Sequence, residues 1–293
     1  GVRRRREGTL TMSVLSKWSF KVSSFVFGED FWRGIVAIIV FLIFWEVGSR
    51  SETLFGFAFP WVGQVPAPSA VLKEIYRLIQ EPSFWHSAYL STLRVLEGFF
   101  AAMLVGIPLG LAMAVSRTFY GITFPVFEVL RPIPPLAWVP AAIIFWPTQE
   151  LSIAFVTFLG AFFTIVINVI GGAQSIDVRY FQAARSMGSS TFDIFRRIIL
   201  PGVLPSIVVG ATVGIGITWA VVVAAEMISG GGSAGSMGGA AGGGLGFFIW
   251  NSYVGGSYTQ IVAGMISIGV AGYMSSAILR KIGQLLTPWL AEG

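Results

Sequence analysis

The sequence predicts an all-α integral membrane protein with six transmembrane helices. Hydrophobic residues make up 55% of the 293 residues and charged residues only 11%, whereas soluble proteins carry about 25% charged residues. Six long apolar segments are separated by polar connections, and a helix needs about 20 apolar residues to cross a bilayer. The basic residues are dispersed between these segments, as the orientation signals of a membrane protein are.

The first predicted span, Phe31–Gly48, follows residues 1–30, which we expect to form a cytoplasmic N-terminal segment. Within it, Gly1–Lys21 carries several arginines but no compact apolar core followed by a small-residue cleavage site. We therefore expect no cleaved signal peptide here, and Met12 is a candidate for the natural start.

Residues 31–86 are expected to contain the first span and an outer segment with a short amphipathic helix. Ser69 is a suitable N-cap for this helix because its hydroxyl can accept from a free backbone N–H. The spacing of the apolar residues places one face of the helix against the protein. That face consists of Val71, Leu72, Ile75, Leu78 and Ile79.

Residues 87–293 are predicted to hold the other five spans, which are rich in small residues. Glycines four residues apart let two helix backbones approach closely in a bilayer. Such pairs are Gly106 with Gly110 and Gly210 with Gly214. The spans themselves are Ser87–Val115, Phe119–Trp146, Leu151–Ala173, Gly202–Ile228 and Gln260–Leu279.

Arg131 lies in the third of the six spans, directly before a proline-rich stretch of Pro132, Pro134, Pro135 and Pro140. Prolines leave backbone carbonyls unpaired, and such backbone is tolerated at membrane depth only against protein or water. An arginine there is a candidate for contact with an anionic solute. The alternative is that Arg131 anchors the span or pairs with Glu128.

Other charged residues also lie inside predicted spans. Glu226, near the outer end of the fifth span, is expected to form a gate or a structural ion pair, because a carboxylate within a span is costly and usually faces a partner or a cavity. The alternative is that Glu226 simply lies at the membrane interface. Arg94 and Glu97 are three residues apart and are expected to pair with each other. Trp138 and Trp219 are candidates for lining a pathway, although tryptophan is common at membrane interfaces.

A polar segment between the fourth and fifth spans has a helical pattern in which Ala184, Gly188, Phe192 and Phe195 share one face. This face would be a notch of small residues flanked by two aromatic rings. Because Pro201 cannot donate a backbone hydrogen bond, we expect it to separate this segment from the next span.

Gly230–Gly246 contains ten glycines in 17 residues and is predicted to be a flexible outer loop. It leads into Leu245–Trp250, which is too short to span and fits a re-entrant or interfacial half-helix. The loop is either a docking surface for an external protein or a passive linker.

The lysines and arginines predict that both termini are cytoplasmic, because basic residues are enriched on that side. Three lie outside in this topology (Arg50, Lys73 and Arg77), and Arg94 and Arg131 lie within spans. The remaining 14 of the 19 lie inside: Arg3, Arg4, Arg5, Arg6, Lys17, Lys21, Arg33, Arg117, Arg179, Arg185, Arg196, Arg197, Arg280 and Lys281.

Several function classes are excluded by composition. Cysteine is absent, so disulfides and thiolate metal ligands are absent too. The net charge of +5 is spread between apolar spans, so we expect no nucleic-acid partner. There is no Gly-Lys-Ser or Gly-Lys-Thr phosphate-binding sequence, and the spans hold no paired carboxylates, Ser/His arrangement or metal-ligand spacing. We therefore expect no enzyme, no metal and no bound cofactor.

The polar segment resembles the cytoplasmic EAA loop of bacterial ABC importer permeases. The matching residues are Gln182, Ala183, Ala184, Gly188, Ile198, Leu200 and Pro201, with Gln182 in place of the family's glutamate. Four stretches further resemble the permeases for nitrate, bicarbonate, taurine and sulfonates. They are Thr92–Phe99, Arg131–Trp138, Ala183–Gly188 and Ala224–Met227.

The resemblance implies a type I ABC importer permease fold in a bacterial inner membrane, with a coupling helix at about residues 177–197 that docks on an ATPase. It implies a second copy of the permease, two cytoplasmic ATPase subunits that bind the ATP, and an external solute-binding protein. The solute would be a small oxyanion or a related molecule. The alternative that the residues leave open is an ion-coupled secondary transporter or a channel.

Overall fold

The computed structural model describes residues 29–52, 56, 65–230 and 243–290, and throughout these ranges every regular element is a helix. The chain forms two compact units, residues 1–70 and residues 71–293. Five helices are long and apolar enough to cross a membrane in the described ranges, or six if one bent pair counts as a span. This confirms the predicted membrane protein.

The first unit contains α2, Glu29–Ser49, which is the first predicted span. Near its end, Glu46 pairs with Arg50 at 2.7 Å and accepts a 2.8 Å hydrogen bond from the Ser69 hydroxyl. The helix α4, Pro68–Ile79, begins one residue before Ser69. The prediction that Ser69 is the N-cap was therefore wrong, because its hydroxyl is bonded to Glu46 and proline occupies the first helical position.

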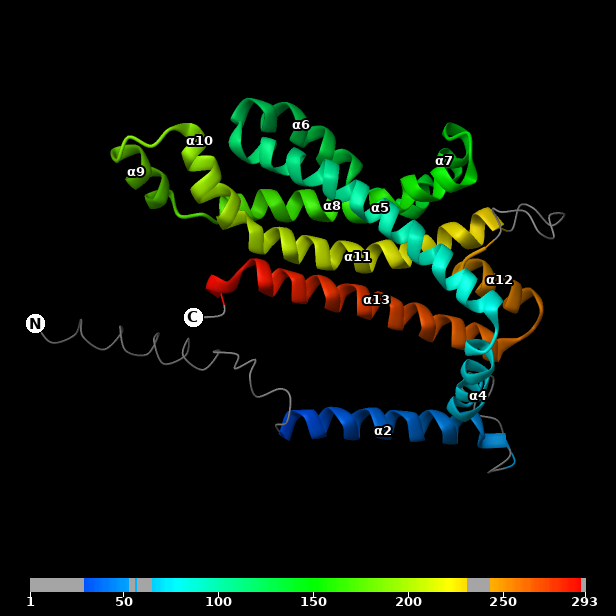
Figure 1. Ribbon diagram of the computed structural model, residues 1–293. Coiled ribbons are helices and arrows are strands. Elements are labelled where there is room, and N and C mark those ends of the chain that lie inside the picture. The colour runs from blue at the N-terminus through cyan, green and yellow to red at the C-terminus, as the bar shows by residue number, and fades with distance from the viewer. Residues whose placement is uncertain (1–28, 53–55, 57–64, 231–242, 291–293) are drawn as a thin grey trace, which may run out of the picture. The chain divides into compact units, whose positions relative to one another are not determined.

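The second unit is built on three long helices, α5 (Pro82–Val115), α8 (Gln149–Gln174) and α11 (Leu200–Gly230). Figure 1 shows α8 and α11 side by side with α5 across them, and α13 (Tyr258–Leu286) lies along α11. Val71 and Leu78 of α4 are buried in the core of this unit. Ile75 packs against the same core, but Leu72 is 66% exposed and Ile79 is 49% exposed. The predicted apolar face is therefore confirmed for three of its five residues and was wrong for Leu72 and Ile79.

Glycines allow the three long helices to pack closely. A Cβ added to Gly110 of α5 would lie 2.8 Å from Val169 of α8, and one added to Gly210 of α11 would lie 2.8 Å from Asn168 of α8. Backbone contacts of this kind replace the hydrophobic drive that packs helices in water. The glycines that we predicted to mediate helix packing do so on both sides of α8.

The third predicted span is not one straight helix. The helix α6 (Arg117–Leu130) and the segment Pro135–Phe145, which comprises η3 (Pro135–Trp138) and α7 (Val139–Phe145), differ in direction by 86°. The prolines between them have no N–H to continue a helix, and their rings clash with the preceding turn. The predicted span Phe119–Trp146 is thus a bent pair of helices, broken at the prolines as their chemistry indicated, with Arg131 at the C-cap of α6.

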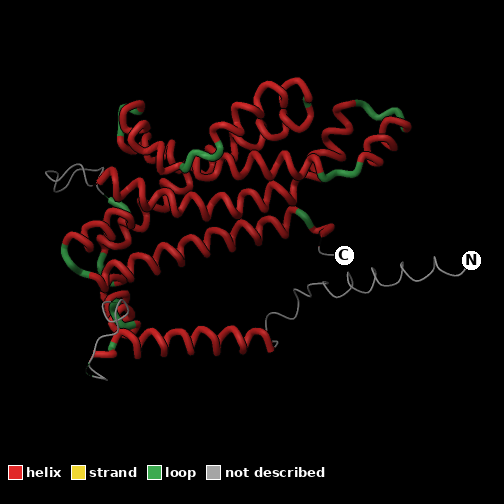
Figure 2. Tube along the Cα trace, turned by 180° about the vertical axis from the view of Figure 1, so that it is seen from behind, coloured by secondary structure: helices red, strands yellow, loops and turns green. Residues whose placement is uncertain are grey.

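The second unit has two distinct ends. At one end, α5, α8 and α13 finish, and two short helices, α9 (Val178–Ser186) and α10 (Thr191–Ile194), connect α8 to α11. We call this the α9 end. At the opposite end, the α12 end, α12 (Leu245–Val254) joins α11 to α13. Figure 2 shows the same arrangement from behind.

Candidate functional site

The connection between α8 and α11 consists of two helices separated by a turn at Gly188. Asp177 caps α9 by accepting from the Arg179 N–H at 2.9 Å, and Ser190 caps α10 by accepting from the Asp193 N–H at 3.1 Å. Gly188 has a φ of 76°, a backbone conformation that glycine adopts without steric cost and that commonly ends helices.

The predicted single helix over this segment was therefore wrong. Gly188 and Phe192 do not continue the face of Ala184, because Gly188 reverses the chain after α9 ends at Ser186. The Ser189 N–H returns to the Ala184 carbonyl at 3.0 Å, which closes the turn. Helical spacing alone could not reveal this, since a glycine fits both a helix notch and a left-handed turn.

The turn carries exposed apolar side chains next to the glycine. Met187 is 78% exposed and Phe192 is 69% exposed, while Ala184 is buried at 5%. Gln182 and Ala183 are exposed on α9. We call Gln182, Ala183, Met187, Gly188 and Phe192 the turn surface. Met187 and Phe192 are thus large apolar side chains left exposed on either side of the Gly188 turn, and exposed apolar surface of this kind is common where proteins bind partners.

Pro201 does not separate the segment from the fifth span, contrary to the prediction. The helix runs without interruption from Thr191 to Ile228. A π-helical turn, η4 (Phe195–Ile199), precedes the proline, and the Leu200 N–H bonds to the Phe195 carbonyl. Pro201 has no N–H for the usual bond four residues back, and a wider turn is one way that a helix passes such a residue.

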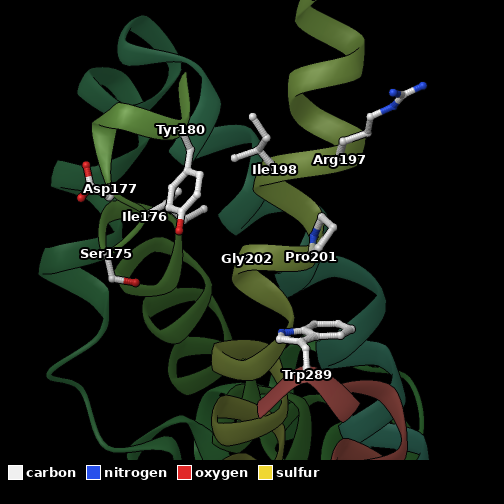
Figure 3. A pocket seen from close by; sticks show the side chains of 9 residues that line it. All are labelled: Ser175, Ile176, Asp177, Tyr180, Arg197, Ile198, Pro201, Gly202 and Trp289. Carbon is white, nitrogen blue, oxygen red and sulfur yellow. The ribbon is translucent and has the colours of Figure 1, made fainter. Parts of the chain in front are cut away.

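Ile198 and Pro201 line a cavity of about 610 Å³ at the α9 end. Figure 3 shows Tyr180 from α9 and Trp289 from the C-terminal η5 (Pro288–Leu290) on two sides of it, while Arg197 points away. The cavity is also lined by Ser175, Ile176, Asp177 and Gly202. The helix η5 therefore lies close to the connection that follows α8.

Charges at the α9 end are mostly exposed. The side chain and backbone N–H of Arg179 donate to Asp177, and these bonds lower the pKa of the Asp177 carboxyl. Arg197 lies 3.8 Å from Asp193 and its side chain is 80% exposed. Arg196 is exposed as well. The turn surface is thus bordered by solvated positive charge.

Arg131 lines a separate cavity of about 340 Å³ between the bend after α6 and helices α8 and α11. Its side chain is 47% exposed and donates to Glu128 at 3.2 Å. The ion pair with Glu128 that the sequence offered as the alternative is therefore present. Contact between Arg131 and an anionic solute stays a prediction. The cavity is otherwise lined by Pro135, Leu159, Gly160, Phe163, Thr164, Ile167 and Ile217.

The two candidate tryptophans lie in different surroundings. Trp138 ends η3 and meets Phe155 edge-on at 6.4 Å. Its buried indole N–H has no acceptor among the described residues. Trp219 is 3% exposed and donates to the Ser275 hydroxyl at 3.2 Å, between α11 and α13. A role for either in a solute pathway remains a prediction.

Glu226 is 2% exposed and pairs with Arg94, which is also 2% exposed, at 2.8 Å. The expected pair between Arg94 and Glu97 is wrong, because Arg94 turns to Glu226 of α11 and to Glu150 of α8, at 2.5 Å. Glu97 is exposed on α5. Charges inside apolar helices must find partners, but sequence spacing identifies only partners on the same helix.

Comparisons with known proteins agree with this architecture. Residues 106–292 match the model of the family described as the binding-protein-dependent transport system inner membrane component. The nitrate import permease protein of Synechocystis is 34% identical over 90% of this chain and 92% of its own length. The taurine transport system permease of Escherichia coli is 32% identical over 78% of this chain and 81% of its own length.

The bicarbonate transport system permease of Synechococcus elongatus is 29% identical over 92% of both chains. Among solved structures, a chain of the MetNI methionine ABC transporter matches with a TM-score of 0.58 and 20% identity over 71% of this chain and 99% of its own. A chain of a bacterial alginate ABC transporter matches with a TM-score of 0.54 and 12% identity over 96% of both. These structures support the fold alone.

Proposed function

This chain belongs to the binding-protein-dependent transport system inner membrane components, the multi-pass permease subunits of ABC importers, and from this premise we propose that it moves a small oxyanion or a related zwitterion. The relatives are named for nitrate, taurine and bicarbonate. These solutes share a compact group of oxygen atoms that carries negative charge. An arginine suits such a group because its planar guanidinium donates two parallel hydrogen bonds.

Arg131 is the residue that we assign to the solute. It lies at the break between α6 and η3, beside a cavity of about 340 Å³ that α8 and α11 also line. Broken helices within membrane proteins present free backbone groups, and they are tolerated where they line a cavity. The Glu128 carboxylate balances the arginine charge when no solute is present, and a passing anion would compete with it.

The turn surface is the proposed docking site for the ATPase subunits. It is exposed, mostly apolar and held by two capped helices. Its Gly188 leaves room for a partner to approach, since a Cβ there would meet nothing within 4 Å. Gln182 adds polar hydrogen-bonding groups to this surface without charge. The ATP itself would be bound by those partner subunits, so this chain needs no cofactor.

The α9 end is proposed to be cytoplasmic. Arg179, Arg185, Arg196 and Arg197 all lie there, and basic residues are enriched on the cytoplasmic side of bacterial membrane proteins. The same rule places both termini in the cytoplasm. The α12 end then faces outward, toward a solute-binding protein.

A transport cycle follows from this arrangement. Two copies of the chain would share one pathway, and ATP binding would draw two ATPase subunits and their turn surfaces together. Because α10 continues through η4 into α11 without a break, movement at the turn would be carried along the span as a rigid body. The pathway would open outward, and ATP hydrolysis would reset it.

The alternative of a secondary transporter or a channel is not favoured, because the family assignment covers residues 106–292 and includes the whole of the connection between α8 and α11. A secondary carrier has no need of a docking surface for ATPases. The family assignment, together with the relatives' solutes, is the observation that carries the proposal.

The test is reconstitution of the chain in lipid vesicles with an ATPase and a solute-binding protein, which are sought first among the genes next to its own. Nitrate, bicarbonate, cyanate, taurine and an alkanesulfonate are each added, and both ATP hydrolysis and uptake are measured. We expect one or more of these anions or zwitterions to stimulate both activities. Uptake without ATP, or no stimulation of ATP hydrolysis and uptake by any of these solutes, would refute the proposal.

A further inference from the structure

Four polar side chains from three helices meet at the α12 end of the second unit. They are Ser91 and Arg94 of α5, Glu150 of α8 and Glu226 of α11, and we call them the anchor cluster. Arg94 makes two bonds to Glu150, of 2.8 and 2.5 Å, and one to Glu226, of 2.8 Å. The Ser91 hydroxyl donates to the Glu226 carboxylate at 2.8 Å.

The cluster also binds the beginning of α12. Arg94 donates to the Gly243 carbonyl at 2.5 Å, the Leu245 N–H donates to Ser91 at 2.8 Å, and the Gly246 N–H donates to Glu226 at 2.9 Å. The first N–H groups of a helix have no partner within it. Here a serine and a carboxylate from two other helices supply those partners, and the negative charge of Glu226 suits the positive end of the helix dipole.

Glycine is required for this fit. A Cβ on Gly244, whose φ is 131°, would lie 2.4 Å from the Glu226 carboxyl carbon, and one on Gly246 would lie 2.3 Å from the Val223 carbonyl. A Cβ on Gly243 would lie 2.3 Å from the Leu90 side chain. At these three glycines the chain is therefore pressed against α5 and α11 with no space for a Cβ, and the anchor cluster holds the start of α12 there.

Glu226 also lies near one end of a long continuous helix. The run from Thr191 to Ile228 has 38 residues and is about 55 Å long at about 1.5 Å per residue. Its other end begins directly after the Gly188 turn. One rigid element therefore connects the turn surface to the anchor cluster, and through that cluster to α12.

We propose that Glu226 and Arg94 are positioning residues that connect α12 to α11, so that docking of a binding protein at the α12 end changes ATP hydrolysis at the α9 end. This inference rests on the proposed function, which places the binding protein at the α12 end. The exposed face of α12 includes Trp250, Asn251 and Tyr253. A partner that contacts this face moves α12, and the anchor cluster passes the movement to α11.

The buried charges are consistent with this role. Arg94 and Glu226 are each 2% exposed in an apolar bundle. Two well-packed apolar side chains would stabilise the fold about as much as such a buried ion pair does. What an apolar pair could not supply is the set of directional bonds to Gly243, Leu245 and Gly246. The anchor cluster thus fixes the orientation of α12 as well as its contact with α5 and α11.

The experiment measures ATP hydrolysis by the reconstituted complex without and with the solute-loaded binding protein. The Glu226→Gln variant keeps the size of the side chain and leaves Arg94 paired with Glu150. We expect basal hydrolysis within about twofold of the unmodified complex and stimulation by the binding protein reduced about fivefold or more, the lower range of allosteric coupling factors. Glu97→Gln makes the same chemical change at an exposed position on α5, the helix that carries Arg94. It is the matched control and should leave both activities unchanged.

A second variant and a second readout keep the inference testable if Glu226→Gln fails to assemble. Ser91→Ala removes the bonds to Glu226 and Leu245 without changing charge, and it should reduce stimulation in the same selective way. A nitroxide label at Asn251→Cys should become more mobile in either variant, and the absence of native cysteine makes this label specific.

Three outcomes are decisive. Selective loss of stimulation together with greater mobility of α12 supports the inference. Equal loss of basal and stimulated hydrolysis, or unchanged stimulation, overturns it and leaves the cluster a purely structural feature. A third outcome is that no solute-loaded binding protein stimulates ATP hydrolysis by the unmodified complex. That result would refute the proposed function and is distinct from a failure of this inference.

Discussion

Replacement of Gly188 by tryptophan tests whether the turn surface docks on an ATPase. A Cβ at this position would meet nothing within 4 Å in the chain itself, so the new side chain would project from the turn without disturbing the fold. The φ of 76° imposes a backbone cost of about 1–2 kcal/mol on a residue with a Cβ. A folded protein is typically stable by about 5–15 kcal/mol, so the variant should still insert and assemble as a membrane protein.

The effect on docking should be larger than the effect on folding. A bulky side chain forced into a packed interface costs about 1–3 kcal/mol, and about 1.4 kcal/mol changes an affinity tenfold. Each turn surface should thus bind its ATPase roughly 5- to 150-fold more weakly. With two copies of the chain, both contacts are affected, and transport should fall more than ATP hydrolysis.

The assay compares ATPase affinity, ATP hydrolysis and uptake for Gly188→Trp and Gly188→Asn. Asparagine tolerates the left-handed backbone better than most residues and is much smaller, so it controls for the backbone cost. We expect the asparagine variant to retain most of its transport and the tryptophan variant to lose it. Normal affinity and normal uptake in Gly188→Trp would show that the turn surface is not the docking site.

Three further predictions follow from the structure. Arg131→Lys should lower solute-stimulated uptake strongly with assembly unchanged, because lysine keeps the charge but loses the guanidinium fork; normal uptake would leave Arg131 only its ion pair. In spheroplasts, an impermeant thiol reagent should label Ser83→Cys at the α12 end but not Ser186→Cys on α9, and the reverse pattern would invert the orientation. Gly98→Ala should destabilise the protein by about 1–3 kcal/mol in a thermal-unfolding assay, because the new Cβ would lie 2.2 Å from a threonine hydroxyl of α8. Gly216→Ala is the control: a Cβ there has open space, so this variant should be neutral or stabilising.

The sequence was sufficient to predict the spans and the general location of the site. Apolar segments such as Leu151–Ala173 are read directly from hydropathy, because a bilayer requires about 20 apolar residues whatever the rest of the fold does. The connection around Gly188 was recognisable as a candidate site because polar and small residues interrupt that pattern. The position of the break in the third span was also predictable, because each proline disrupts the helix at its own place in the sequence.

Short-range spacing was less reliable where two local structures use the same residues. The glycine at position 188 fits the face of one helix and equally fits a turn between two. Pro201 can end a helix or, after a π-helical turn, be accommodated within it. In each case the energy of the surrounding packing decides, and that energy is not a property of the local sequence.

Tertiary structure alone decided which charges meet. Glu97 and Glu226 are both carboxylates available to Arg94, and the sequence favours Glu97 because it is one helical turn away. The fold instead brings Glu226 to Arg94 from 132 residues further along the chain, together with the N–H of Gly246. A charged side chain that folding removes from water pairs with whichever opposite charge is buried beside it. Only the packing of α5, α8, α11 and α12 determines which carboxylate lies beside Arg94.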